Sequence, residues 1–316
     1  MKAIIFNQYG EADVLQYQDV AEPQIQSDQL LVKVYGTSVN PVDWKIRSGQ
    51  IQLLSGFNFP KLIGSDVSGV VVAIGEKVTE FQVGDLVYTF VNPLVGGAYA
   101  EYIAVAASHT ALKPTNLSHA QAATVPLAGL TALQALLDLG EIRSGQTILI
   151  NGASGGVGSF AVQIAKVLQT TVTGICSTAN LEQVKQLGAD TVIDYRQTDF
   201  TQQAAQYDII FDAVGKQSFY RCQNILKPNG IYISTLPTPE NLAAVAQTLL
   251  FPGQKAKLIL VQPRRRDLQA LSTWIEADQI KVVIDQTYPL SEIIQAHRQS
   301  QTGRTVGKIA IEMTQE

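Results

Sequence analysis

The chain has 316 residues, of which 46% are hydrophobic, and its formal net charge is −4. This length allows two domains, and this apolar share can fill a substantial core. A mildly acidic chain lacks the basic surface that nucleic acids and anionic membranes bind, so neither partner is expected. Two cysteines, Cys176 and Cys222, are too few for a disulfide framework, and the first residues read as a strand rather than a leader. We therefore expect a cytosolic protein.

The first 120 residues show strand patterns. Short apolar runs are separated by glycine, proline, asparagine and aspartate, and no long helical period occurs. The predicted strands are 3–6, 29–35, 69–74, 86–89 and 100–105. This pattern predicts a barrel-like β domain. An apolar helix over 121–139 follows as the passage between domains; Pro126, Gly129, Thr131 and Asp138 interrupt it, which indicates a core helix rather than a membrane span.

From residue 145 onward, strands and helices alternate. The predicted strands are 147–150, 171–176, 191–194, 209–213, 230–234 and 257–261, and the helices are 156–168, 180–187 and 217–226. Nearly continuous apolar strands that alternate with helices predict an α/β domain with a doubly wound parallel sheet. The remaining predicted elements are helices over 264–277 and 291–300 and strands over 281–284 and 307–312. We interpret this tail as a return to the N-terminal domain.

A glycine-rich turn joins the first strand of the α/β pattern to its helix. Ala153, Gly155 and Gly158 stand at the three small-residue positions of a dinucleotide fingerprint. We expect Ala153 to serve the tight turn, Gly155 to let the backbone approach a pyrophosphate, and Gly158 to let helix and strand pack closely. The helix N-terminus would add free N–H groups for phosphates. The predicted cofactor-binding residues of this turn are Ala153, Ser154, Gly155, Gly156, Val157 and Gly158.

Further motifs carry a family resemblance. They run from Asn40 to Lys45, Gly64 to Val71, Gly75 to Val87, Gly97 to Tyr102 and Pro126 to Ala132, and the fingerprint follows them. In order and spacing, over essentially the whole chain, they resemble the zinc-independent quinone oxidoreductase and enone (alkenal) reductase branch of the medium-chain dehydrogenase/reductase superfamily. The resemblance implies a Rossmann dinucleotide-binding domain, residues 122–263. This domain would be inserted into a GroES-like β-barrel catalytic domain, residues 1–121 and 264–316.

The positions of the family's zinc ligands can be read in this sequence. Zinc-dependent relatives have a cysteine near position 40 and a His-Glu pair near positions 65 and 66, where this chain has Asn40, Ser65 and Asp66. Asparagine and serine are poor zinc ligands, and the four-cysteine structural lobe is missing, so no metal is expected. Three histidines far apart in the sequence are interpreted as structural or solvated: His109, His119 and His297.

The end of the second predicted strand of the sheet bears on the choice of cofactor. NAD-selective sheets place an acid there to bind the ribose 2′-OH, whereas Ser177 and Thr178 stand there in this chain and the first acid is Glu182. Both hydroxyls could donate to a 2′-phosphate, and the resemblance adds Tyr195 after the third strand. We therefore expect NADPH. The alternative for the two hydroxyls is capping of the next helix. Candidates for a pairing cation are Lys185, Arg196 and Arg264.

The resemblance also implies a mechanism. A hydride would pass to the β-carbon of a conjugated carbonyl in the cleft between the domains, and negative charge would develop on the carbonyl oxygen. Asn40 and Lys45 are the candidate catalytic residues that donate to this oxygen. The alternatives are a turn-forming asparagine and a solvated surface lysine. Trp44 and Tyr99 are the candidate substrate-binding residues, and packing in the core or barrel is the alternative for both.

Three more cofactor-binding candidates rest on the resemblance alone: Thr131, Val214 and Leu236. The sequence thus predicts an NADPH-dependent, metal-free oxidoreductase that acts on enones, alkenals or quinones. The alternative is an NADPH-binding protein with a sensory or structural role and no robust turnover. RNA binding has no support beyond the triplet 264–266, which we interpret as a solvated helix start. A small-molecule substrate and a homodimer are expected.

Overall fold

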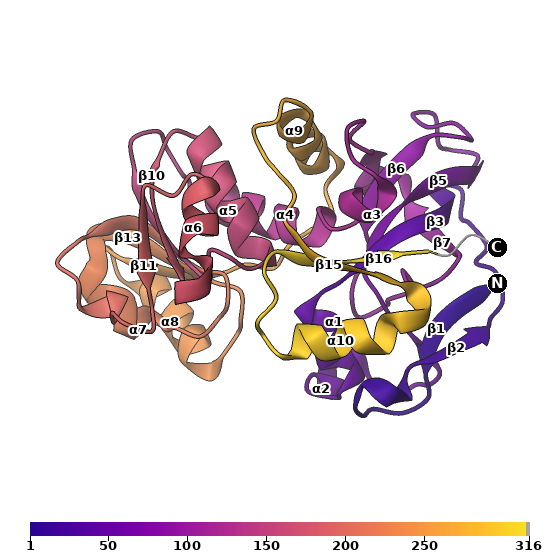
Figure 1. The fold of residues 1–316 in the computed structure, drawn as a ribbon, viewed down its shortest axis with the longest axis horizontal. Helices are drawn as coiled ribbons and strands as arrows, with labels where there is room; N and C mark the ends of the chain where they lie inside the picture. The colour runs from indigo at the N-terminus through magenta and orange to yellow at the C-terminus, as the bar shows by residue number, and fades with distance from the viewer. Residues whose placement is uncertain (314–316) are drawn as a thin grey trace. The chain divides into compact units, whose positions relative to one another are not determined.

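The computed structural model describes residues 1–313 and divides the chain into two compact units (Figure 1). The first unit comprises Met1–Leu127, Pro263–Ala277 and the chain from Ile284 onward. The second comprises Ala128–Gln262 and Asp278–Val283. These units differ from the predicted domain boundaries at three places, since residues 122–127 and Pro263 pack with the first unit and 278–283 with the second.

The first unit is built on two sheets. The larger has the order β15-β16-β3-β5-β6-β8, with β7 also paired to β3, and the smaller has the order β2-β1-β4. Their bounds are β1 Lys2–Phe6, β2 Gln16–Asp19, β3 Gln29–Val39, β4 Lys61–Leu62, β5 Asp66–Ile74, β6 Leu86–Phe90, β7 Tyr102–Ala106, β8 Ala111–Leu112, β15 Ile284–Pro289 and β16 Lys308–Glu312. Because β16 runs antiparallel to β3, the C-terminal tail completes the N-terminal sheet, as Figure 1 shows.

The central strand β3 explains how this sheet covers its core. Leu30, Val32 and Val34 are buried at alternate positions, because successive side chains of a strand point to opposite faces. The helices of the unit are α1 Pro41–Arg47, α2 Gln52–Ser55, α3 His119–Ala122, α9 Arg265–Glu276 and α10 Ile293–Gln301. The sequence patterns missed α1, which directly follows β3. Its first residue is a proline, whose fixed φ suits the first helical position.

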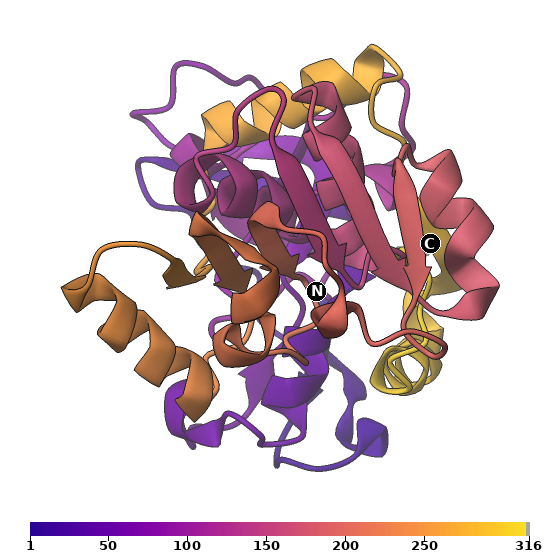
Figure 2. The ribbon, with the colours of Figure 1, turned by 90° about the vertical axis from the view of Figure 1, so that its left-hand side faces the viewer.

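The second unit contains a six-stranded, entirely parallel sheet with the order β11-β10-β9-β12-β13-β14. Figure 2 shows its strands side by side. The bounds are β9 Thr147–Asn151, β10 Thr171–Cys176, β11 Thr191–Asp194, β12 Tyr207–Asp212, β13 Leu226–Ser234 and β14 Lys255–Leu258, with helices α4 Pro126–Gln134, α5 Gly156–Val167, α6 Leu181–Gln186, α7 Phe219–Cys222 and α8 Pro239–Leu250. This order confirms the predicted doubly wound sheet. The strand order reverses between β9 and β12, so ligands are expected at the carboxyl ends of these two strands.

Three predictions of local structure differ from the observed elements. The helix predicted over 217–226 is only α7, followed by a 3₁₀ turn at Gln223–Ile225 and by β13 from Leu226. Residues 281–283 are not a strand, because the Gln163 side chain bonds both backbone groups of Lys281, and the strand β15 begins only at Ile284. The predicted helix over 121–139 consists of three segments, α3, α4 and a π-helical turn at Ala135–Leu139. Within residues 1–313, the stretch His119–Leu139 is the one long and apolar enough to cross a membrane, and 78% of its most apolar window is buried inside the protein.

Candidate active site

The glycine-rich turn after β9 has the geometry of a tight strand-to-helix connection. Gly152 makes the turn with a φ of +80°, and a Cβ there would overlap a methyl group of Val214. Ala153, which was predicted to serve this turn, is instead fully buried against the neighbouring strand. A Cβ on Gly174 would come within 3.1 Å of the Ala153 Cβ. Gly152 was not among the predicted residues, although it is the glycine that directly follows the strand.

Gly155 and Gly158 have different surroundings. A Cβ on Gly158 would overlap the Gly152 carbonyl, so this glycine is required for helix and strand to pack. A Cβ on Gly155 would meet nothing closer than the Gly152 oxygen at 3.4 Å. Packing therefore does not explain Gly155, which caps the N-terminus of α5. The first N–H groups of α5, from Gly156 and Val157 onward, have no partner within the helix and form a ready anion site.

The segment after β10 is tied to this turn. The Asn180 side chain donates a hydrogen bond of 3.0 Å to the Ser154 hydroxyl. Thr178 does not offer its hydroxyl to a phosphate as predicted, because it donates that proton to Asp194. Tyr195 is 53% exposed, and its backbone N–H donates to the Cys176 carbonyl. The structure thus brings Tyr195 beside the end of β10. The acid Asp194 also lies there, which the spacing in the sequence did not reveal.

A buried carboxylate accepts several hydrogen bonds at the switch point of the sheet. Asp212, the last residue of β12, accepts 2.8 Å from the Asn151 amide and also accepts the backbone N–H groups of Val214, Gly215 and Gln217. Burial raises the pKa of Asp212, while these hydrogen bonds lower it. Gly215 has a φ of +71°, and a Cβ there would overlap Leu236. The predicted residues Val214 and Leu236 therefore lie at the carboxyl edge of the sheet.

Thr131 lies on α4 and is 6% exposed. Its assignment to the cofactor stays a prediction. Asp212 was not predicted, although its position as a single acid at the end of an apolar strand could have signalled it.

In the first unit, Asn40 lies at the junction of β3 and α1 and is 2% exposed. Its backbone N–H donates to Asp43, and its side-chain Nδ2 donates 2.8 Å to Asp66. Its Oδ1 accepts a hydrogen bond from the Lys308 ammonium. Asn40 therefore does more than form a turn, because its amide is held in a buried charged network.

Lys45 and Trp44 lie on α1 and are both half-buried. The Lys45 ammonium lies 5.7 Å from the centre of the Trp44 ring. It forms no ion pair within residues 1–313, and burial lowers its pKa. A half-buried cation without a counter-ion is suited to meet negative charge on a ligand. The indole Nε1 of Trp44 is buried and has no hydrogen-bond partner among the described residues.

Tyr99 does not fit its predicted role in substrate binding. It is fully buried among core residues, and its hydroxyl donates to Asp43 at 3.2 Å and contacts the His297 ring nitrogen at 3.3 Å. The alternative, packing inside the barrel, is correct. Burial raises the pKa of Asp43 to about 6. Burial and the nearby Arg47 lower the pKa of His297 to about 3, so this histidine is neutral and structural.

The positions of the zinc ligands hold a set of groups that does not fit zinc. Asn40 offers an amide, Ser65 donates its hydroxyl proton to Asp43, and Asp66 accepts hydrogen bonds from Ser38 and Asn40. The Lys308 ammonium also lies in this network. In the described part of the chain, no three His, Cys, Asp or Glu residues form a group that could hold a metal ion.

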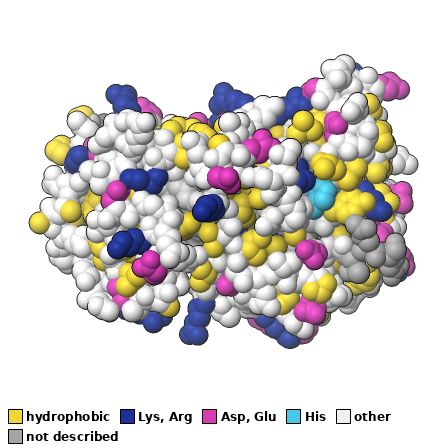
Figure 3. Space-filling model, turned by 45° about the horizontal axis from the view of Figure 1, so that its top comes forward, with side chains coloured by type: hydrophobic (Ala, Val, Ile, Leu, Met, Phe, Trp, Pro, Cys, Tyr) yellow, Lys and Arg dark blue, Asp and Glu magenta, His cyan; other side chains and the backbone are white. Residues whose placement is uncertain are grey.

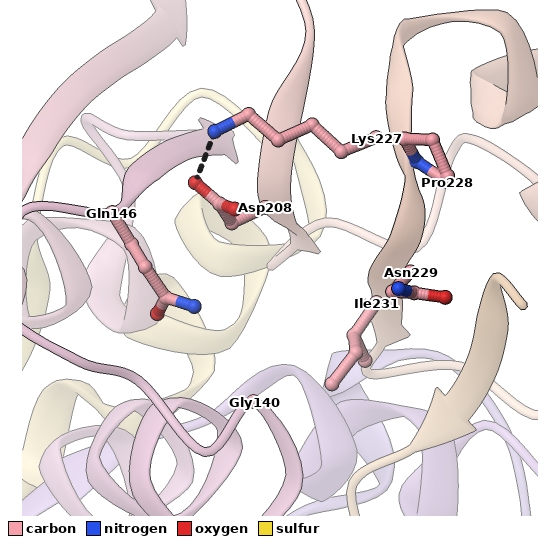
Figure 4. A pocket seen from close by; sticks show the side chains of 7 residues that line it. All are labelled: Gly140, Gln146, Asp208, Lys227, Pro228, Asn229 and Ile231. Carbon is pink, nitrogen blue, oxygen red and sulfur yellow. Dashed lines mark hydrogen bonds and ion pairs between the residues drawn. The ribbon is translucent and has the colours of Figure 1, made fainter.

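A pocket of about 360 Å³ lies elsewhere in the second unit (Figure 4). Figure 4 shows Lys227 reaching to Asp208, with a distance of 2.7 Å between the charged atoms. Gln146, Asp208 and Lys227 stand at the amino ends of β9, β12 and β13, whereas dinucleotides bind at the carboxyl ends. None of the predicted site residues lines this pocket.

Comparisons with known proteins agree with this architecture. Residues 26–115 match the family described as alcohol dehydrogenase GroES-like domain, and residues 187–311 match the family described as zinc-binding dehydrogenase. The chloroplastic quinone-oxidoreductase homolog of Spinacia oleracea is 35% identical over 99% of this chain and 98% of its own length. The chloroplastic NADPH-dependent alkenal/one oxidoreductase of Arabidopsis thaliana is 34% identical over 98% of this chain and 79% of its own length.

Two solved structures are similar to this chain over nearly its whole length. The quinone oxidoreductase from Coxiella burnetii has a TM-score of 0.92 and 33% identity, with 99% of each chain covered. The Escherichia coli quinone oxidoreductase complexed with NADPH has a TM-score of 0.84 and 26% identity, and it covers 99% of this chain and 100% of that one.

The comparisons contradict the prediction of a cytosolic protein. The two plant relatives are named as chloroplastic, and the human NAD(P)H oxidoreductase RTN4IP1, 33% identical over 98% of this chain and 89% of its own length, is named as mitochondrial. That prediction rested on the mildly acidic composition and on the interpretation of the first residues as a strand, and the names of these relatives overturn it. With a GroES-like unit, a doubly wound dinucleotide unit and full-length relatives above 30% identity, the chain belongs to the medium-chain dehydrogenase/reductase family.

Proposed function

We propose that this protein is an NADPH-dependent oxidoreductase that reduces α,β-unsaturated carbonyls, such as enones and alkenals, or quinones, without a metal. The observation that carries the proposal is the bare Gly155 backbone at the N-terminus of α5, at the switch point of a parallel sheet. A dinucleotide pyrophosphate fits this place. The names of the plant relatives, a quinone-oxidoreductase homolog and an alkenal/one oxidoreductase, support the substrate class.

NADPH is the cofactor that the residues of the second unit fit. The N–H groups of Gly156 and Val157 would hold the pyrophosphate, and the Ser177 hydroxyl and the exposed Tyr195 would face the 2′-phosphate. Val214 and Leu236 would line the nicotinamide side. Bound NADPH supplies a hydride. One named relative is NADPH-dependent and one solved relative contains NADPH, which supports this choice.

The chain's own contribution to the chemistry is electrostatic. Reduction of an enone places negative charge on the carbonyl oxygen, and a cation at that oxygen lowers the barrier. Lys45 is the residue that we propose for this role, because its ammonium is half-buried and has no acidic partner among residues 1–313. Asn40 would add an amide donor held rigidly by Asp66 and Lys308. Water would deliver the proton to the α-carbon.

The proposal includes a small-molecule ligand and a homodimer. Figure 3 shows Lys and Arg side chains interspersed with Asp and Glu on one face, in keeping with the net charge of −4. β14 is an edge strand of the parallel sheet, and an unpaired edge is a natural place for a second copy to add. The mass in solution tests the dimer, and a monomeric mass would contradict it.

The experiment that tests the function is loss of nicotinamide absorbance with NADPH and NADH in parallel. The acceptors are an alkenal, a vinyl ketone, a halogenated acrylate and a benzoquinone. Turnover of the alkenal or ketone with NADPH preferred supports an enone reductase, and turnover of the benzoquinone alone moves the assignment to quinone reduction. NADPH binding without turnover of any acceptor would instead favour a sensory or structural protein.

A further inference from the structure

A lysine ammonium stands among the groups at the family's zinc-ligand positions. Lys308 opens β16 and is 4% exposed. Its ammonium donates to Asn40 Oδ1 and lies 3.4 Å from the Val39 carbonyl and 3.5 Å from Asp66 Oδ2. Asn40 and Asp66 are two of the positions at which zinc-dependent relatives would bind metal. The ammonium therefore contacts the side chains at two of these positions.

Strand pairing places the ammonium there. In the antiparallel ladder of β16 and β3, Ile309 is the partner of Val39. The next residues outward, Lys308 and Asn40, therefore fall opposite each other, and the side chain of Lys308 reaches the amide across the end of the ladder. Because this contact depends on residues 268 positions apart, it could not be inferred from local sequence.

Asp66 is the ion-pair partner of Lys308. The carboxylate is fully buried, and its Oδ2 accepts from Ser38 at 2.5 Å and from Asn40 at 2.8 Å. Its Oδ1 accepts the backbone N–H of Leu127 at 2.8 Å. These donors and the Lys308 ammonium surround the buried carboxylate in place of water, as a buried charged group requires. Burial lowers the pKa of Lys308, and Asp66 and Asp43 oppose that effect.

We propose that the Lys308 ammonium is the internal cation of the catalytic unit, which excludes a divalent metal from the place between Asn40 and Asp66 and positions the Asn40 amide for reduction. The second part rests on the proposed function. An amide whose oxygen accepts from an ammonium becomes a stronger N–H donor, since hydrogen bonds in a low-dielectric site polarise one another. Lys308 touches neither substrate nor cofactor in this proposal and acts as a positioning residue through Asn40.

The first test addresses the cation itself and needs no turnover. We compare Lys308→Met, Asp66→Asn and the double variant by thermal unfolding, with zinc content measured after incubation in zinc and desalting. Each single change leaves one buried charge unpaired, so each lowers Tm, and the double variant recovers much of the loss. If the decreases in Tm of the two single variants simply add in the double variant, the proposal that Lys308 is the internal cation is wrong. Binding of one zinc ion per wild-type chain would also contradict it.

The second test separates positioning from stability. We measure kcat with the best enone, and Kd for NADPH by fluorescence, at a temperature well below every Tm. The proposal predicts that kcat falls about 10- to 100-fold in Lys308→Met and stays low in the double variant although its stability recovers, while Kd is unchanged. Recovery of kcat together with Tm in the double variant would show a purely structural role and overturn positioning.

Lys113 provides the matched control. It is a second buried lysine of the same unit, 9% exposed, and its ammonium donates to the backbone carbonyls of Pro114 and Leu117 rather than to a carboxylate. Lys113→Met should lower Tm and leave kcat within about twofold of wild type, which supports the proposal; an equal loss of kcat would count against it. Absence of wild-type turnover would refute the proposed function alone, because the unfolding and zinc measurements still decide whether Lys308 is the cation.

Discussion

The Thr178 hydroxyl donates a hydrogen bond of 2.5 Å to the Asp194 carboxylate, across the ends of β10 and β11. This bond lowers the pKa of Asp194, together with the backbone N–H of Arg196. Asp194 therefore stays ionised, but its charge is partly satisfied by these donors. Of the two hydroxyls predicted to face a 2′-phosphate, that of Thr178 is already bonded, and that of Ser177 has no hydrogen-bond partner among residues 1–313.

We predict that Ser177→Asp reverses cofactor preference. An added carboxylate at the end of β10 repels a 2′-phosphate and accepts from a ribose 2′-OH, so Kd for NADPH should rise about 10- to 100-fold while Kd for NADH falls. Fluorescence titration with both cofactors measures this. The control is Thr178→Val, which removes the hydroxyl that is already bonded to Asp194 and should change the preference little. An unchanged ratio in Ser177→Asp would remove Ser177 from the cofactor site.

Alanine substitutions at two glycines of the fingerprint should affect different properties: stability at Gly158 and NADPH binding at Gly155. Gly158→Ala places a methyl group on the Gly152 carbonyl and should cost about 3 kcal/mol of stability, seen as a clear drop in Tm. Gly155→Ala meets its nearest atom at 3.4 Å, so it should fold normally and instead weaken NADPH binding at least tenfold. Normal NADPH affinity in a well-folded Gly155→Ala would show that no cofactor approaches this backbone.

Removal of the Lys45 charge should slow catalysis selectively. Lys45→Met keeps the length and apolar contacts of the side chain but loses the cation, so kcat/KM for an enone should fall about 100-fold with Kd for NADPH unchanged. Lys33→Met is a suitable control, because the Lys33 ammonium also lies near an aromatic ring, 5.6 Å from the centre of Tyr35. Equal, small effects of both substitutions would indicate a solvated surface role for Lys45.

Acid should destabilise the first unit through His297. Its folded pKa of about 3 lies below the ordinary value of 6.5, so the unfolded chain binds the proton more readily. The stabilisation is present above pH 6.5 and is lost as pH falls toward 3, by on the order of a few kcal/mol. The raised pKa of Asp43, about 6, works in the opposite direction between pH 4 and 6.

The variant His297→Phe isolates the histidine contribution. It retains an aromatic ring against Tyr99, whose ring lies edge-to-face with that of His297. Lowering the pH from 7 to 4.5 should therefore reduce the free energy of unfolding in urea more in wild type than in the variant, which keeps only the opposing contribution of Asp43. An identical difference in both proteins would show that His297 is not the group that titrates.

Local patterns predicted the second unit better than the first. β10 and β11 have the predicted bounds. β10 is buried from its second residue on and reads as a nearly continuous apolar run, and turns bound both strands. The wrong strand at 281–284 looked equally apolar, but its backbone is bonded by Gln163, which lies 118 residues away. Whether Tyr99 faces a ligand or the core likewise depends on distant residues. Lys308 was missed for the same reason, since only the register of β16 against β3 brings it to Asn40.

Isotope transfer tests the central claim most directly. The protein is incubated with a vinyl ketone and NADPH that carries deuterium on the transferable C4 position, and the product is examined by mass spectrometry and NMR. The account predicts a saturated ketone that is one mass unit heavier than its unlabelled counterpart, with deuterium at the β-carbon and a solvent proton at the α-carbon. An allylic alcohol with deuterium at the carbonyl carbon, or no transfer while NADPH remains bound, would contradict it.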